Sequence, residues 1–121
     1  MDKHNTEIAI VAVSKVKPGK LEEFTAIAAE LVAHVESTEE GALSYRWFVG
    51  SDNETVTVIE NYASSEAILF HAQNYAAHAA RLADLRESAS ITVFGNVSEQ
   101  LAKGLSAQGV AIHSPLVGFA R

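Results

Sequence analysis

Two short stretches of alternating residues constrain the fold of this chain more than any other feature. Residues 43–49 place Leu, Tyr, Trp and Val on one parity, and residues 56–62 place two valines, Glu60 and Tyr62 on one parity. A period of two residues is typical of a strand with two unlike faces. The intervening residues 51–54 (Ser-Asp-Asn-Glu) are typical of a tight turn between paired strands. The sequence therefore predicts a β-hairpin.

Glu60 is the unusual residue of this hairpin, because its carboxyl group shares a strand face with Val56 and Val58. A carboxylate on an apolar face either lines a pocket or is paired with another group. Glu60 is therefore a candidate functional residue.

The segment before the hairpin predicts one strand and one helix. Residues 8–14 are apolar on both parities, which indicates a strand covered on both faces. Residues 17–20 (Lys-Pro-Gly-Lys) predict a turn. A helix is then expected from about Leu21 to Glu36, with an apolar stripe at helical spacing. The stripe comprises Phe24, Ile27, Ala28, Leu31 and Val35.

The segment after the hairpin predicts a second helical region over residues 65–87, with an interruption near Asn74. If the helix is continuous, His71, Tyr75 and His78 lie on its apolar side. Next come an expected strand over residues 90–97, a short helix from 99 to about 105, and an extended apolar tail over 110–119. Pro115 confines that tail to a sheet edge, a bulge or a bend.

The predicted order of elements is strand, helix, strand, strand, helix, strand, which matches the ferredoxin-like α+β unit. We expect one domain over residues 1–121, with a core at about 8–97 and a C-terminal extension at about 98–121. Both helices of this unit cover one sheet face, yet the first strand is apolar on both sides. The same face of a second copy would cover the other side, so we expect a homodimer. The tail is expected to dock on its own chain or on the partner.

Composition excludes several classes of function. The net charge is −6 and no basic run is present, which argues against nucleic-acid binding. The apolar run at residues 8–13 is far shorter than the roughly 20 residues that span a membrane. The chain has no cysteine, which excludes disulfides and thiolate catalysis. We expect a cytoplasmic protein with neither a membrane nor a nucleic-acid partner.

Three segments resemble a known family when taken together. They are residues 17–20, residues 40–45 (Glu-Gly-Ala-Leu-Ser-Tyr), and residues 59–67 (Ile-Glu-Asn-Tyr-Ala-Ser-Ser-Glu-Ala), followed by His71. Their order and spacing resemble the antibiotic biosynthesis monooxygenase family of dimeric α+β barrel proteins. The resemblance covers about residues 8–95.

This resemblance implies a small cavity between the sheet and the helices. Studied members include cofactor-free oxygenases of phenolic or quinol substrates and haem-degrading enzymes. The family's glutamate corresponds to Glu60, its helix histidine to His71, and its usual tryptophan to Tyr62. The haem-degrading branch matches less well. Its asparagine and tryptophan positions fall near Ala12 and His71, and only His78 offers a candidate haem ligand.

We therefore predict His71 and Glu60 as catalytic residues, because a histidine backed by a carboxylate can deprotonate a phenol or quinol. The predicted substrate is a small aromatic or quinol molecule, with no cofactor and no metal. The predicted substrate-binding residues are Trp47, Tyr62, Tyr75 and His78.

Three alternatives remain open. Glu60 and the histidines could be satisfied core groups of a non-catalytic ligand-binding or structural dimer. Trp47 could be a core or interface residue. A metal site at His71 and His78 is disfavoured, since seven residues separate them by ~10 Å along a helix.

Overall fold

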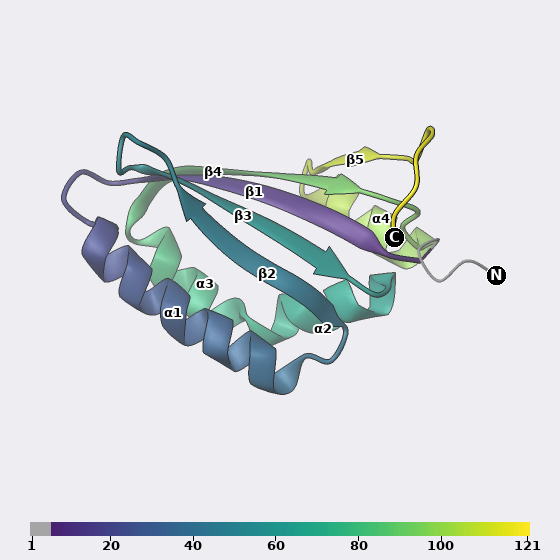
Figure 1. Cartoon of the computed structure of the whole chain (residues 1–121), viewed down its shortest axis with the longest axis horizontal. Coiled ribbons are helices and arrows are strands. Elements are labelled where there is room, and N and C mark those ends of the chain that lie inside the picture. Colours follow the sequence, from purple (N-terminus) through teal and green to yellow (C-terminus); the bar gives the residue numbers. More distant parts are fainter. Residues whose placement is uncertain (1–5) are drawn as a thin grey trace.

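A computed structural model describes residues 6–121 of the chain. Figure 1 shows a single, mostly antiparallel sheet with the helices on one side of it. The elements in chain order are β1 (Ile8–Val16), α1 (Leu21–Thr38), β2 (Ala42–Val49), β3 (Thr55–Tyr62), α2 (Ser65–Asn74), α3 (Ala76–Ala83), β4 (Arg86–Phe94), α4 (Glu99–Ala107) and β5 (Ala111–His113).

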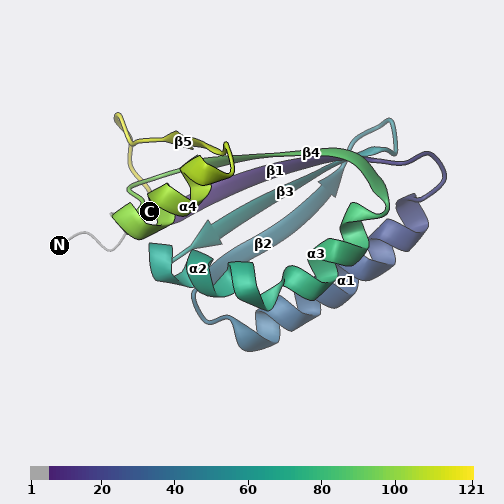
Figure 2. The same cartoon turned by 180° about the vertical axis from the view of Figure 1, so that it is seen from behind.

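The sheet has the strand order β2-β3-β1-β4-β5. Strand β1 lies at its centre and pairs antiparallel with both β3 and β4, whereas β5 runs parallel to β4 at the edge. Figure 2 shows α1, α2, α3 and α4 on the same face. The predicted ferredoxin-like α+β fold is confirmed, and the C-terminal extension adds α4 and one edge strand to it.

The predicted periodicities of β3 and α1 are confirmed by burial. Val56, Val58, Glu60 and Tyr62 are all buried on the helix-facing side of β3. The whole predicted stripe of α1 is buried as well, and it packs against Val16, Val56 and Leu82. A second cluster, which includes Ile8, Tyr62 and Leu101, fills the space towards α4.

The predicted break near Asn74 is confirmed, because α2 ends at Asn74 and α3 begins at Ala76. The predicted helix end at residue 87 and strand start at 90 are wrong. Helix α3 ends at Ala83, and β4 already begins at Arg86, where it pairs with Val16 of β1. Pairing along the full length of the central strand outweighs the local polar sequence, as tertiary context often does.

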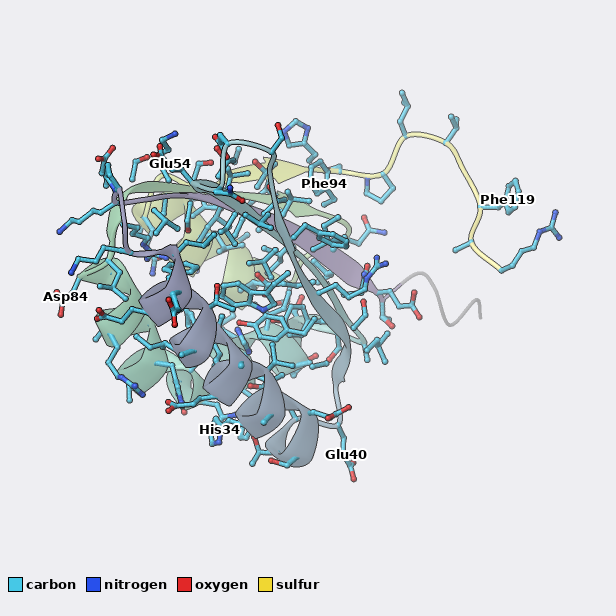
Figure 3. All side chains as sticks on the ribbon, turned by 60° about the vertical axis from the view of Figure 1, so that its left-hand side comes forward. His34, Glu40, Glu54, Asp84, Phe94 and Phe119 are labelled. Atoms are coloured by element: carbon cyan, nitrogen blue, oxygen red, sulfur yellow. The ribbon has the colours of Figure 1, made fainter. Side chains whose placement is uncertain are left out.

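The C-terminal tail also differs from expectation. Its strand comprises only Ala111–His113, because Pro115 lacks the N–H group that a longer ladder needs. Leu116, Val117 and Phe119 are 92%, 92% and 83% exposed, and Figure 3 shows Phe119 on a segment that runs away from the body. Val110 and Ile112 pack beside α4, whereas Leu116, Val117 and Phe119 do not pack on their own chain. Docking on a second copy stays a prediction.

The sheet face opposite the helices is apolar but only partly covered. Val11 and Val13 of β1 are half-buried, while Phe48 is 47% and Phe94 is 40% exposed. The strand register places Phe48 beside Thr57 and Val13, and Phe94 beside Ala9, on this one face. A single chain thus leaves several apolar side chains in contact with water.

No helix within residues 6–121 has both the length and the apolar character needed to cross a membrane.

Candidate functional site

A cavity of about 230 Å³ lies between the helix-facing side of the sheet and the helices α2, α3 and α4. Its wall is largely apolar, and all four long strands contribute to it. Helix α4 and the residues after it form part of the wall through Leu101, Gly104, Leu105, Gln108 and Val110. The polar and aromatic lining residues are Ser14, Tyr45, Trp47, Glu60, His71, Tyr75, Arg86 and Gln108.

Glu60 reaches the cavity from the middle of the sheet. It stands opposite Ile10 on β1 and opposite Tyr45 on β2. The hydroxyl group of Tyr62 donates a 2.6 Å hydrogen bond to its Oε1 atom. Because Tyr62 lies two residues further on the same strand face, this contact follows directly from strand geometry.

The environment of Glu60 changes its acidity. Burial raises the pKa of Glu60 to about 7; the hydrogen bond from Tyr62 opposes this rise, and the nearby Glu39 carboxylate adds to it. Burial and the neighbouring Glu60 also raise the pKa of Tyr62, so its hydroxyl group remains a donor. Glu60 can therefore hold or release a proton near neutral pH.

His71 is held by a carboxylate from a distant part of the chain. Its Nδ1 atom lies 2.9 Å from both Oε1 and Oε2 of Glu39, the residue that caps the C-terminus of α1. Both side chains are buried, each residue being 5% exposed. Asn74 donates to Glu39 Oε2 and to Thr38 Oγ1, each at 2.8 Å, which fixes the carboxylate in place.

This contact determines which nitrogen of His71 can act as a base. An ionised carboxylate only accepts hydrogen bonds, so Nδ1 carries the proton that it donates to Glu39. The Nε2 atom of the neutral ring is then an acceptor, and it lies 3.9 Å from Oε1 of Glu60. Burial lowers the pKa of His71, while Glu39 counteracts that shift. The imidazole is consequently neutral and basic at Nε2 near pH 7.

Three tyrosine rings surround the His71 imidazole. Tyr75 stacks on it with a centroid distance of 4.6 Å and an interplanar angle of 18°. Tyr45 meets it edge-on at 5.3 Å, and Tyr62 lies tilted at the same distance. These ring contacts restrict the orientation of the imidazole.

The predicted site residues divide into two groups. Glu60, His71, Tyr75 and Trp47 line this cavity. Tyr62 does not line it: this fully buried residue stands behind Glu60, not at the wall as expected.

His78 lies outside the lining too, with its ring 5.5 Å from the ring of His34 and its Nδ1 atom buried without a hydrogen-bond partner. The break at Tyr75 accounts for this difference. His78 was expected beside His71 on the assumption of one continuous helix, but α2 ends at Asn74 and α3 begins at Ala76.

Several residues of the site were not predicted from the sequence. Glu39 belongs to a pair of glutamates at a helix end, a pattern that indicates solvent exposure. Arg86 was expected in a helix. Tyr45 had a usable signal, since it shares the strand parity of Trp47 and stands opposite Glu60 in the hairpin.

Within residues 6–121, no three His, Asp or Glu side chains are placed to share a metal ion. His71 and His78, the pair considered above, make separate contacts with Glu39 and His34.

Comparison with known proteins gives one family match. The sequence model of the family described as antibiotic biosynthesis monooxygenase matches residues 7–83. No curated protein sequence matches the chain. The matched segment ends at α3, so β4, α4 and β5 lie beyond it.

Several solved structures share the fold. MupZ from Pseudomonas fluorescens superposes with a TM-score of 0.86 at 21% identity, over 97% of this chain and 96% of that one. A proposed antibiotic biosynthesis monooxygenase from Caulobacter crescentus has a TM-score of 0.71 at 28% identity, over 78% and 92% of the chains. SnoaB, a cofactor-independent oxygenase from Streptomyces nogalater solved as the mutant N63A, has a TM-score of 0.67 at 18% identity, over 77% and 95%.

Proposed function

The chain belongs to the antibiotic biosynthesis monooxygenase family, and we propose that it is a cofactor-independent monooxygenase of a small aromatic or quinol substrate. The observation that carries this proposal is the placement of His71. Its Nδ1 atom is held 2.9 Å from Glu39, and its Nε2 atom stands 3.9 Å from the cavity-lining Glu60. A histidine oriented by a carboxylate on one side and free on the other is suited to general base catalysis.

The proposed reaction begins with proton transfer. The substrate hydroxyl group gives its proton to Nε2 of His71, and the Glu39 carboxylate stabilises the resulting imidazolium. The electron-rich phenolate then forms a carbon–oxygen bond with O₂, which accepts two electrons. Protonated Glu60 donates a proton to the terminal peroxide oxygen and gives a hydroperoxide.

The second half of the reaction restores both residues. The Glu60 carboxylate removes the hydrogen on the oxygenated carbon as the O–O bond breaks, and His71 returns its proton to the departing oxygen. The products are a quinone-type carbonyl and one water molecule, so O₂ supplies one oxygen atom to each. The roughly neutral pKa of Glu60 suits a group that must both donate and accept a proton.

The proposal is tested by O₂ consumption with a panel of quinols and naphthols. We expect uptake above the uncatalysed background, with a product that carries one atom from ¹⁸O₂. Binding of these compounds without O₂ uptake would instead support the alternative function, a non-catalytic ligand-binding domain.

We further propose that the chain acts as one domain and assembles into a homodimer through the sheet face opposite the helices. The partly exposed Phe48 and Phe94, with the half-buried Val11 and Val13 between them on that face, support this, since exposed apolar surface marks interaction sites. Light scattering should give twice the 12.9 kDa chain mass at micromolar concentration. A 12.9 kDa particle would contradict the dimer.

A further inference from the structure

The end of the cavity remote from Glu60 holds an unpaired cation. Arg86, at the start of β4, is the one lysine or arginine among the lining residues. Its guanidinium makes one long hydrogen bond, 3.5 Å from Nη1 to Ser14 Oγ. Among residues 6–121 no carboxylate lies within ion-pair distance of it. A guanidinium offers five N–H donors, so most of its hydrogen-bonding capacity is unused.

Trp47 contributes its ring to this cavity, and not a hydrogen-bond donor. The ring lines the wall, whereas the Nε1 atom is buried without a hydrogen-bond partner. Trp47 also borders a second hollow, beside Phe24 and Thr25 of α1. Strands β3 and β1 separate it from Arg86 on β4. The polar groups at the Arg86 end of the cavity are therefore Arg86 and Ser14.

The two ends of the cavity therefore differ in charge. Glu60 stands opposite Ile10, and Ser14 lies four residues further along β1, which corresponds to ~13 Å. Both groups act on Tyr75, which stacks on His71: burial and Glu60 raise its pKa, whereas Arg86 lowers it. The Glu60 carboxyl group lies at one end, and the Arg86 guanidinium, with most of its donors unused, lies at the other.

We propose that the ligand of this cavity is a carboxylic acid whose carboxylate binds the Arg86 guanidinium and the Ser14 hydroxyl group. The planar guanidinium fork matches the two oxygens of a carboxylate. We place a phenolic or quinol hydroxyl group of the same ligand at His71, and this part rests on the proposed function. The anion subsite itself rests only on the contacts around Arg86.

The subsite can be tested by anaerobic calorimetric titration with two matched probes, 6-hydroxy-2-naphthoate and its methyl ester. The wild-type protein should bind the acid at least about tenfold more tightly than the ester, as expected for a charge-assisted bidentate pair. Arg86→Gln should remove that preference and leave the ester affinity unchanged. Arg86→Lys keeps the charge without the fork and should retain part of the preference.

Arg81→Gln is the matched control, because it removes the same charge from an exposed arginine paired with Glu30 outside the cavity. It should keep the full preference for the acid. Equal affinities for both probes in the wild type, no binding of either, or an Arg86→Gln variant that weakens both probes equally would each overturn the proposal.

Oxygen uptake measured separately distinguishes this proposal from the oxygenase proposal. A preference for the acid without O₂ uptake would leave the anion subsite standing and reject the oxygenase. Uptake with neutral quinols and no preference for the acid would reject the subsite alone.

Discussion

Glu39 holds the imidazole of His71 across 32 positions of the chain, with both carboxylate oxygens 2.9 Å from Nδ1. The two residues come from different elements, the C-terminal cap of α1 and the last turn of α2. Their contact fixes the tautomer of the ring and aims Nε2 towards Glu60. Glu39 is thus a positioning residue in the proposed reaction.

Glu39→Gln tests this relationship. The amide keeps the shape of the side chain but removes the charge that raises the pKa of His71, so that pKa should fall further. We expect turnover to drop by about 100-fold or more, measured as O₂ uptake, with the His71 ring titration followed by NMR. Glu40→Gln changes the exposed neighbouring residue and should alter neither quantity. A His71 pKa in Glu39→Gln that equals the wild-type pKa would refute the positioning role.

His71→Ala should abolish O₂ uptake in a protein that still folds. The change leaves the buried Glu39 carboxylate without its histidine partner, and such a loss costs roughly 1–3 kcal/mol of unfolding free energy. Urea denaturation and O₂ uptake measure the two effects separately. Turnover of His71→Ala near the wild-type rate would show that another group is the base. If the wild-type protein itself consumes no O₂ and His71→Ala only lowers the stability, the ligand-binding alternative is supported.

Glu60 should make stability depend on pH. Its pKa rises from an ordinary value of 4.5 to about 7 on folding, so the folded state binds the proton more tightly than the unfolded state. The associated stability is fully present below about pH 4.5 and is lost as the pH rises through about 7. Glu60→Gln removes this dependence while still accepting the Tyr62 hydrogen bond.

Relative to Glu60→Gln, the wild type should therefore lose up to roughly 3 kcal/mol of unfolding free energy between pH 4.5 and 8. Urea denaturation of both proteins across this range provides the measurement. Parallel stability curves would mean that Glu60 does not titrate in this window. His71 lies 3.9 Å from Glu60, so its ring titration should be followed by NMR in both proteins to separate its contribution.

The exposed tail gives a prediction about assembly. Leu116, Val117 and Phe119 are too apolar to remain in water, so we expect them to dock on a second copy. Truncation after Ser114 keeps β5 and should weaken the dimer at low micromolar concentration, as measured by light scattering. Replacing the three residues with serine at full length should have the same effect. An unchanged dissociation constant in both variants would rule out a tail contact between copies.

Local pattern in the sequence predicted what a short segment can determine. The two-residue period placed Glu60 on the buried face of β3, and the helical period gave the complete buried stripe of α1. Contacts between distant segments produce no periodic pattern in the sequence, so they were not predicted. The partnership of Glu39 with His71 depends on how α1 and α2 pack, and the early start of β4 at Arg86 depends on pairing with β1.

The position of His78 also could not be predicted from local sequence pattern. Its expected place in the site assumed one continuous helix, and the break at Tyr75 put it beside His34 instead.

Helix α4 adds to the cavity a wall that lies outside the family match. Leu105 and Gln108 bound the cavity from a segment beyond the family match, while Glu39, Glu60 and His71 all fall within it. Gly104 even leaves open space, since a methyl group there would meet no atom within 4 Å. Substitutions in α4 can therefore change the size of the cavity without altering Glu39, Glu60 or His71, so the volume of the site and its proposed proton-transfer groups can evolve independently.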